Sequence, residues 1–209
     1  MTKNVNPQYS VVIGDAVASR ALAVDERTTL QARLHDVLAD VNRRWAGAVA
    51  APFTIVLGDQ FEGVLEADAP AWDVIHFLRA ELRAVDWIIA CGRGAITTPL
   101  SGATPELDGP SFHLAREALE QAKANRMVLA FAGFADDSLA ALAAYYSALY
   151  WSWTSRQRRV ANMLRVIEPS DVAERLGVDR SAISHVSRRM RWDLVTAADA
   201  AFRRRLEAS

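Results

Sequence analysis

The chain has 209 residues, of which 51% are hydrophobic and 23% are charged. This composition predicts a globular protein with a core, and it excludes disordered, collagen-like and disulfide-framework proteins. The single cysteine, Cys91, excludes an intrachain disulfide and a cysteine-based zinc site. Because the first eight residues are polar and lack the apolar core of a signal peptide, we expect a cytoplasmic protein with no membrane partner.

The net charge of −1 conceals two oppositely charged parts. Residues 155–209 contain 12 arginines and 7 acidic residues, a formal charge of +5, whereas residues 1–154 contain 12 basic and 18 acidic residues, a formal charge of −6. This asymmetry predicts two functional parts, of which the basic one faces an anionic partner. The alternative is a solvated arginine-rich helix.

The first six predicted elements follow the order strand, helix, strand, strand, helix, strand. They are expected at residues 9–13, 25–45, 53–57, 61–65, 70–85 and 87–96. This is the order of a ferredoxin-like sheet, antiparallel with helices on one face. Gly92 and Gly94 interrupt the last of these strands and indicate a bulge or a close backbone approach.

A loop at residues 97–110 precedes a predicted helix at 111–124 and a strand at 127–131. Residues 138–155 then carry no charge over 18 residues, which is the lower limit for spanning a membrane. The stretch contains several Ser, Thr and Tyr residues, and its large side chains recur at helical spacing. We therefore expect a buried helix, packed on two sides, at a domain junction or a dimer interface.

The C-terminal part carries the pattern of a helix-turn-helix. Residues 169–176 predict a short helix with Ser170 as its N-cap, and Gly177 ends it in a sharp turn. Asp179 then caps a second helix at residues 180–192. Apolar residues recur at spacings that wedge the two helices together: Val172, Leu176, Val178, Ile183 and Val186.

The second of these helices has a polar and basic outer face. In a helix-turn-helix this face enters the major groove of DNA, where Arg pairs with guanine and Ser or His contacts base edges or phosphates. We therefore predict double-stranded DNA as a partner, although an ordinary helical hairpin with a basic face is the alternative. The segment resembles the helix-turn-helix of bacterial regulators and sigma-factor-like domains. The predicted DNA-binding residues are Arg180, Ser181, Ser184, His185, Arg188 and Arg189, and Arg191 is expected to reach a phosphate.

Two Gly-Asp pairs stand out in the N-terminal part. Gly14 and Asp15 end the first strand, and Gly58 and Asp59 lie in the predicted hairpin turn. In a ferredoxin-like sheet the first strand lies next to that hairpin, so the two carboxylates are able to converge at one edge. Two carboxylates with backbone carbonyls suit Mg²⁺ or Mn²⁺, which holds the phosphates of a nucleotide. The alternative is a pair of turn aspartates that bond their own backbone.

Four motifs in this part resemble the SatD family of bacterial proteins: YSVVIGDAVASR, FTIVLGDQFEGVL, GRGAIT and DGPSFHLAR, within residues 9–132. The resemblance implies a core similar to the palm domain of class III nucleotidyl cyclases, in some members followed by a DNA-binding segment. It implies that Asp15 and Asp59 match the two metal-binding aspartates of that palm. It also implies that residues 109–116 match the start of the cyclase helix that carries transition-state residues.

The sequence departs from the cyclase pattern at that helix. His113 stands where a cyclase has Asn, and Arg116 comes one residue before the expected Arg position, a rotation of about 100° on a helix. Ile55 replaces the base-reading Lys of adenylyl cyclases. The nucleotide-binding candidates are Gly14, Gly58, Asp108, Gly109 and Arg116, with Asp108 preferred over Glu62 as a third carboxylate.

These observations predict an α+β protein in three parts. A palm-like ferredoxin-fold domain spans residues 1–135, an apolar connecting helix spans 136–155, and a helix-turn-helix domain spans 156–209. The predicted function is a DNA-binding transcriptional regulator, a homodimer, whose palm binds a nucleotide with Mg²⁺ or Mn²⁺. The alternatives are an active nucleotidyl cyclase or nucleotidyltransferase, and a palm used only for dimerisation.

Overall fold

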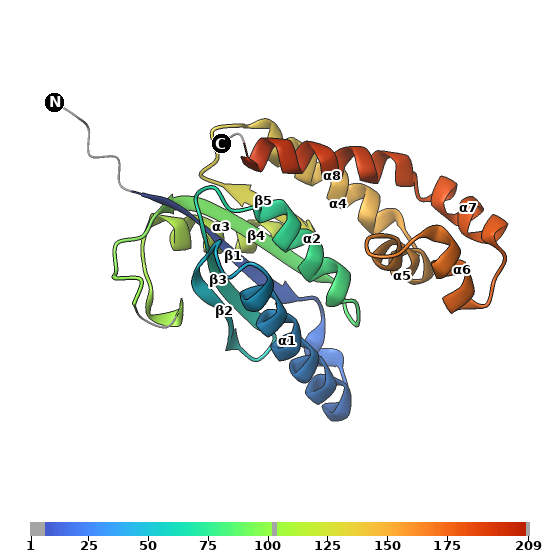
Figure 1. Ribbon diagram of the computed structural model, residues 1–209, viewed down its shortest axis with the longest axis horizontal. Coiled ribbons are helices and arrows are strands. Elements are labelled where there is room, and N and C mark those ends of the chain that lie inside the picture. The colour runs from blue at the N-terminus through green and yellow to red at the C-terminus, as the bar shows by residue number, and fades with distance from the viewer. Residues whose placement is uncertain (1–6, 102–103, 208–209) are drawn as a thin grey trace.

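The computed structural model describes residues 7–101 and 104–207. Its N-terminal two thirds form a sheet of five strands in the order β2-β3-β1-β4-β5, shown in Figure 1. The strands are β1 (Gln8–Ala16), β2 (Val49–Leu57), β3 (Gln60–Glu66), β4 (Trp87–Ala95) and β5 (Leu129–Ala132). The helices that accompany them are α1 (Val24–Arg44), α2 (Ala71–Glu81) and α3 (Pro110–Ala124). We call β1–β5 with α1–α3 the sheet region.

The first six elements have the predicted ferredoxin-like arrangement. β1 lies between β3 and β4 and pairs antiparallel with both, and β2 pairs antiparallel with β3. The elements that follow lie outside that prediction and extend the sheet by one parallel strand. β5 pairs parallel with β4, and the connection between them carries α3 across the opposite face of the sheet.

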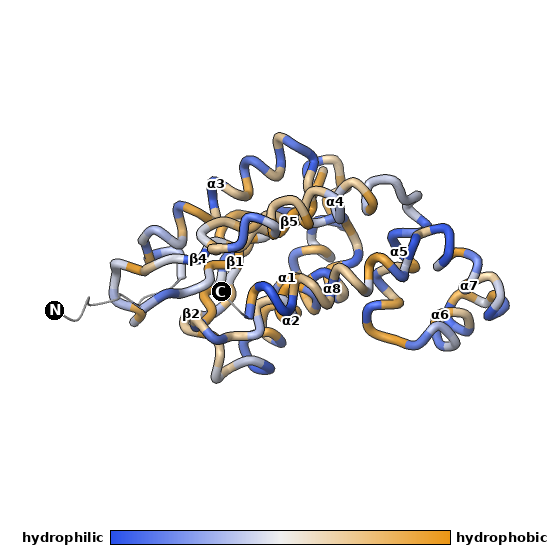
Figure 2. Tube along the Cα trace, turned by 90° about the horizontal axis from the view of Figure 1, so that it is seen from above, coloured by the Kyte–Doolittle hydropathy of each residue, from blue (hydrophilic) through white to orange (hydrophobic). Residues whose placement is uncertain are grey.

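Side chains alternate along β1 and divide the interior into two layers. Val12 and Ala16 belong to the core that includes α1 and α2, whereas Val11 and Ile13 belong to the core under α3. Figure 2 shows α3 on one side of the sheet and α1 and α2 on the other. A side chain on Gly92 would overlap the backbone of Ala115 in α3, so the close approach predicted for this glycine is confirmed.

Five helices follow the sheet region: α4 (Ser138–Ser152), α5 (Ser155–Leu164), α6 (Pro169–Leu176), α7 (Arg180–Arg189) and α8 (Trp192–Glu207). The helix predicted at residues 138–155 corresponds to α4, which begins at Ser138 as predicted and ends three residues earlier, at Ser152. Thr154 caps α5 by accepting a hydrogen bond from the Gln157 amide, and the Thr154 amide donates to Gln157 Oε1 at 2.9 Å. This reciprocal capping stabilises a new helix start at that point.

α4 is packed on one side rather than on two. Tyr146, Ser147 and Tyr150 are buried against the sheet region, while Tyr145 is 79% exposed. The exposed face of α4 consists largely of alanines, so the helix has no charged face even though this side is open to solvent. These alanines are Ala140, Ala141, Ala144 and Ala148. In the described part of the chain, no helix is long and apolar enough to cross a membrane.

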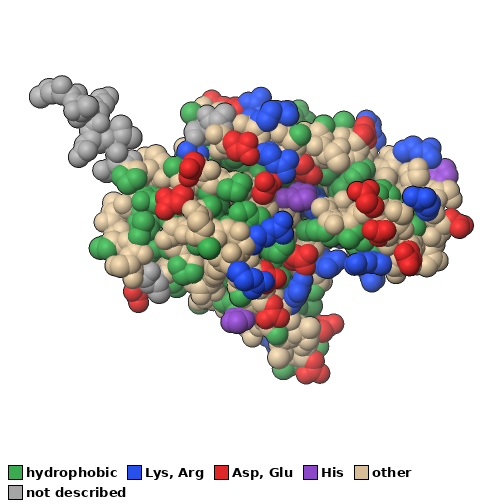
Figure 3. All heavy atoms as spheres, in the orientation of Figure 1, with side chains coloured by type: hydrophobic (Ala, Val, Ile, Leu, Met, Phe, Trp, Pro, Cys, Tyr) green, Lys and Arg blue, Asp and Glu red, His purple; other side chains and the backbone are tan. Residues whose placement is uncertain are grey.

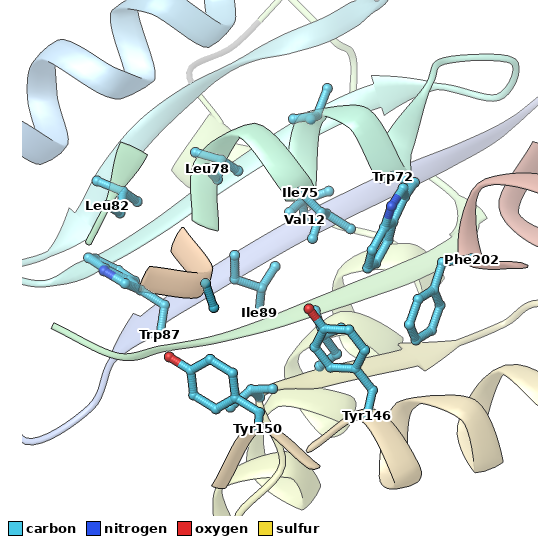
Figure 4. Packing of buried hydrophobic residues seen from close by; sticks show 14 of the residues in the cluster. Val12, Trp72, Ile75, Leu78, Leu82, Trp87, Ile89, Tyr146, Tyr150 and Phe202 are labelled. Atoms are coloured by element: carbon cyan, nitrogen blue, oxygen red, sulfur yellow. The ribbon is translucent and has the colours of Figure 1, made fainter. Parts of the chain in front are cut away.

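The last helix returns to the sheet region. α8 runs back beside α4, and its Phe202 stacks on Trp72 of α2 with ring centroids 4.3 Å apart (Figures 1 and 4). The Tyr146 ring of α4 packs edge-on against the Phe202 ring. The Tyr146 hydroxyl also accepts hydrogen bonds from Arg79 of α2 and Arg165 at the end of α5. One continuous core therefore joins the sheet region to the C-terminal helices.

Cys91 lies in the middle of β4 and is fully buried. Burial raises the pKa of its thiol to about 12, with Arg93 and Ser10 opposing that effect. A thiol that stays protonated is a poor nucleophile and a poor metal ligand. The prediction that Cys91 is a small core residue is confirmed by its burial.

Candidate functional site

The two Gly-Asp pairs meet at one end of the sheet. Asp15 lies at the end of β1 and pairs across the ladder with Gln60, the first residue of β3. Asp59 lies in the preceding turn, where Gly58 has a φ of 50°, a conformation that favours glycine. Asp15 and Asp59 line the same cavity, which has a volume of about 360 Å³. We call this cavity the palm pocket.

Lys123, in the last turn of α3, reaches into the palm pocket and forms an ion pair with Asp15. It also contacts Glu120 Oε1 at 2.9 Å. Burial lowers the pKa of the Lys123 ammonium, but its hydrogen bonds to Asp15 and Glu120 and their negative charges outweigh burial, so the pKa is raised overall. The lysine is therefore a permanent cation beside the Asp15 carboxylate at neutral pH.

The loop after β1 forms the other wall of the palm pocket. Ser19 donates a hydrogen bond from its hydroxyl to Asp59 Oδ2. Arg20 lines the palm pocket and also a neighbouring cavity of about 160 Å³, which Arg27 of α1 lines as well. Neither arginine forms an ion pair within the part of the chain that is described. The loop contributes the free Arg20 guanidinium and α1 contributes that of Arg27, both in cavities that Asp59 also lines.

A second ion pair lies on the same face of the sheet, one step further along β3. Glu62 pairs with Ile13 across the ladder, so it faces α3, and its side chain is only 5% exposed. Arg116 of α3 contacts both Glu62 oxygens, at 3.4 and 3.5 Å. Arg116, which is rotated away from the cyclase Arg position, therefore neutralises the buried Glu62 carboxylate. Glu62, rather than Asp108, is the carboxylate nearer to the palm pocket.

The remaining nucleotide-binding candidates lie elsewhere. Asp108 and Gly109 precede the first turn of α3, whereas Lys123 lies in its last turn, about 20 Å away along the helix axis. Asp108 is 3.4 Å from Nε2 of His113, and its backbone carbonyl accepts hydrogen bonds from residues of the preceding loop. Gly14 lies beside Asp15, but a side chain there would overlap the Phe61 ring, so this glycine serves packing.

The donor set of the palm pocket suits a hard cation. Carboxylate oxygens are the protein ligands that Mg²⁺ and Mn²⁺ prefer, and Asp15 and Asp59 provide them in one cavity. The described ranges contain no cluster of three or more His, Cys, Asp or Glu side chains that could hold a metal ion. Further ligands therefore have to come from backbone carbonyls, from water or from a phosphate. A bound cation also competes with the Lys123 ammonium for Asp15.

The second candidate site is the outer face of α7. α6 and α7 pack through the buried residues Val172, Ala173 and Ile183, and Gly177 between them has the left-handed conformation that the sequence predicts. The prediction of Ser170 as the N-cap of α6 is wrong. Glu168 occupies that position, because Pro169 fits the first helical turn, where its missing N–H costs nothing.

All six predicted DNA-binding side chains of α7 are exposed: Arg180, Ser181, Ser184, His185, Arg188 and Arg189. Within the described residues, none of the three arginines forms an ion pair with an acidic side chain; Arg188 lies 3.4 Å from Nδ1 of His185. Figure 3 shows basic and histidine side chains at the end of the molecule where α7 lies. Arg191 has a φ of 54° and pairs with Asp193 at 3.5 Å.

Three residues that line the palm pocket were not predicted as site residues: Ser19, Arg20 and Lys123. Ser19 and Arg20 lie in the YSVVIGDAVASR motif that drew attention to Asp15, so the motif itself was the signal. Lys123 also had a signal, because the chain contains only 2 lysines against 22 arginines. A lysine in such a chain stands out as a specific choice over arginine.

The sequence matches the SatD family over residues 9–164, which is most of the chain and extends from β1 to the end of α5. Among solved structures, a bacterial light-regulated adenylyl cyclase is similar, with 16% identity and a TM-score of 0.42 over 60% of this chain and 75% of that chain. Another such cyclase structure has 15% identity and a TM-score of 0.41, over 61% and 44% of the respective chains. The search of curated proteins found no match.

Proposed function

This chain belongs to the SatD family, and we propose that it is a DNA-binding transcriptional regulator whose sheet region binds a nucleotide together with Mg²⁺ or Mn²⁺. The observation that carries the proposal is the outer face of α7. Three arginines project from one short helix of a helix-turn-helix without acidic partners in the described chain. Unpaired arginines at this position are suited to phosphates and to the guanine edge in the major groove.

The test of DNA binding starts from selection of bound duplexes out of a genomic or random library with the full chain. The variant Arg180→Ala/Arg188→Ala is expected to lose at least tenfold in affinity for the selected duplex. The matched control is Arg204→Ala, an exposed arginine of α8 that has no ion pair in the described residues. Equal losses in variant and control, or no selected duplex, would contradict the proposal.

The palm pocket supports the nucleotide half of the proposal. Asp15 and Asp59 offer oxygen ligands to a divalent cation, and that cation would neutralise the phosphates it bridges. Arg20 lines the same cavity with a free guanidinium that suits phosphate oxygens, and Lys123 would become available to them once a metal ion takes its place at Asp15. Arg116 does not join them, since Glu62 engages its guanidinium.

A second candidate function is nucleotidyl transfer or cyclisation, which the shared cavity of Asp15, Asp59 and Lys123 favours. We nevertheless expect little cyclic product. Arg116 is displaced from the cyclase position and is paired with Glu62. His113 and Ile55 also replace residues that cyclases have at those positions. Chromatography after incubation with ATP or GTP and Mn²⁺ decides between the two. Robust product that disappears in Asp59→Asn would make the protein an enzyme.

We also propose that the chain forms a homodimer through α4. Its exposed face is uncharged and carries Tyr145 among alanines, which allows close helix approach. Two helix-turn-helix units in a dimer would contact two half-sites. Sedimentation at micromolar concentration is expected to show a dimer for the native chain and a monomer for Tyr145→Arg. A monomeric native chain would contradict this assembly.

A further inference from the structure

A large cleft lies between the sheet region and two C-terminal helices, α5 and α6. Its volume is about 880 Å³, more than twice that of the palm pocket. One wall is formed by residues 83–86, which connect α2 to β4, and the other by α5 and α6. We call it the junction cleft. Its volume lies in the range of pockets that bind small organic ligands.

The junction cleft is strongly basic. Arg83, Arg158, Arg159 and Arg175 line it, and Asp86 is the acidic residue among its lining. Basic side chains along this junction are visible in Figure 3. Four guanidinium groups around one cavity repel each other and attract an anion from solution.

Two of the four arginines are fixed by the protein. Arg158 lies 3.3 Å from Asp86, donates to the Trp153 carbonyl at 2.6 Å and stacks over the Tyr150 ring. Arg83 is 3.8 Å from Glu81, a carboxylate that Arg33 already engages.

The other two arginines have no such partner. Arg159 of α5 and Arg175 of α6 make no hydrogen bond or ion pair with their side chains in residues 7–101 and 104–207. Both are exposed at the mouth of the cleft, on adjacent helices. They can therefore close on an anion at little cost, because no existing bond has to be broken.

A buried amide points to a ligand independently of the charges. Asn162 lines the junction cleft, is only 8% exposed, and its side chain has no hydrogen-bond partner in the described structure. The amide is not among the fully buried unpartnered polar atoms of the described residues, so it is open to the cavity, where a ligand that displaces water can supply its hydrogen bonds. Met163 and Leu176 give the same cavity an apolar surface beside the amide.

We propose that the junction cleft binds a phosphate-bearing small molecule of nucleotide size, at a site separate from the palm pocket. Guanidinium groups pair with phosphate oxygens in a bidentate manner, which suits Arg159 and Arg175. The Asn162 amide and the apolar surface suit a base or a similar polar ring. A duplex is too wide to enter a concave cavity of this size, which favours a small molecule over the DNA backbone.

The position of the cleft gives the ligand a regulatory consequence, which rests on the proposed DNA-binding function. A molecule held between residues 83–86 and α5–α6 contacts both the sheet region and the helices that orient α7. If DNA and ligand favour different orientations of these helices, each changes the affinity for the other by the same factor.

The first experiment measures ligand binding without DNA. ATP, GTP and pyrophosphate are titrated into the full chain at fixed ionic strength, without divalent metal, by calorimetry. Saturable binding is expected for the native chain. Arg159→Ala/Arg175→Ala should reduce the affinity at least tenfold. Arg159→Lys should reduce it less, because lysine keeps the positive charge but cannot form the bidentate contact of a guanidinium. The same tenfold loss is expected when the two cleft arginines are changed in the background of Asp59→Asn, because the two cavities are separate.

The matched control is Arg156→Ala, an exposed arginine on α5 that does not line the cleft. An equal loss in this control would show general charge attraction and overturn the proposal. So would the absence of saturable binding to all three anions, or the absence of the tenfold loss in the Asp59→Asn background. If the cleft variant loses DNA affinity while no small anion binds, the cleft contacts the DNA backbone instead. Because no DNA is present in the titration, its outcome is independent of the proposed DNA binding.

Discussion

The palm pocket and the outer face of α7 both concentrate charged side chains, but they differ in how those charges are paired. In the palm pocket Lys123 neutralises Asp15, Ser19 donates to Asp59, and nearby Arg116 neutralises Glu62. On α7, Arg180 and Arg189 have no acidic partner among the described residues. In the palm pocket both carboxylates already have partners in the protein, although Arg20 is free, whereas the arginines of α7 are left for an external anion.

This difference separates two energetic situations. A ligand that enters the palm pocket competes with existing ion pairs, so it has to bring its own cation or displace Lys123. A phosphate that approaches α7 replaces only water and released counterions. We therefore expect DNA binding to show strong salt dependence, and palm binding to depend mainly on which cation is present.

The largest expected effect is that of salt on DNA binding. If a dimer makes about six phosphate contacts, its affinity should fall about 1,000-fold between 50 and 200 mM salt. Arg188→Ala and Arg189→Ala should each reduce the slope of log K against log salt by about one per protomer. Fluorescence anisotropy at several salt concentrations measures this slope, and a flat profile would contradict the role assigned to α7.

Nucleotide with metal should stabilise the native state. At 100 times Kd the expected gain is about 2.7 kcal/mol, which corresponds to a rise in Tm of about 5–10 °C for a chain of this size. Differential scanning calorimetry with ATP or GTP and Mn²⁺ measures the rise. Asp15→Asn and Asp59→Asn should abolish the part of the rise that requires Mn²⁺, because only the palm pocket holds the metal, and should leave any metal-independent rise from the junction cleft. If Mn²⁺ adds nothing to the Tm of the native chain with nucleotide, the palm pocket does not bind metal and nucleotide together.

Arg180 lies in the first turn of α7, the part of a recognition helix that contacts bases. Arg180→Ala should cost about 1–3 kcal/mol on the preferred duplex and relax specificity at one base pair. Binding to duplexes mutated at each position shows the change. A uniform loss on every sequence would instead make Arg180 a phosphate contact.

Much of this architecture could be predicted from local sequence. The strand at residues 9–13 and the helix stop at Gly177 follow from patterns of a few neighbouring residues, and such patterns act at short range. The convergence of Asp15 and Asp59 followed from the predicted strand order, because that order alone places the hairpin turn beside the end of β1.

The contacts that were missed depend on long-range packing. Lys123 meets Asp15 because α3 crosses the sheet and ends where β1 ends, and nothing near Lys123 in the sequence encodes that path. The same path carries Asp108 to the opposite end of the sheet. Phe202 reaches Trp72 only because α8 turns back after Arg191, whose positive φ is unusual for a residue other than glycine.

The smallest expected effect tests whether Asp15 in the palm pocket is paired in the way described. Lys123→Ala removes the ammonium that occupies Asp15, so the pocket should bind Mn²⁺ alone about tenfold more tightly, a change of about 1.4 kcal/mol. Lys123→Arg keeps the positive charge and should bind Mn²⁺ as weakly as the native chain does. Electron paramagnetic resonance of free Mn²⁺ measures both affinities. Equal affinities in native chain and Lys123→Ala would mean that the lysine does not compete with a metal, and that Asp15 is paired with Lys123 for folding rather than held for a cation.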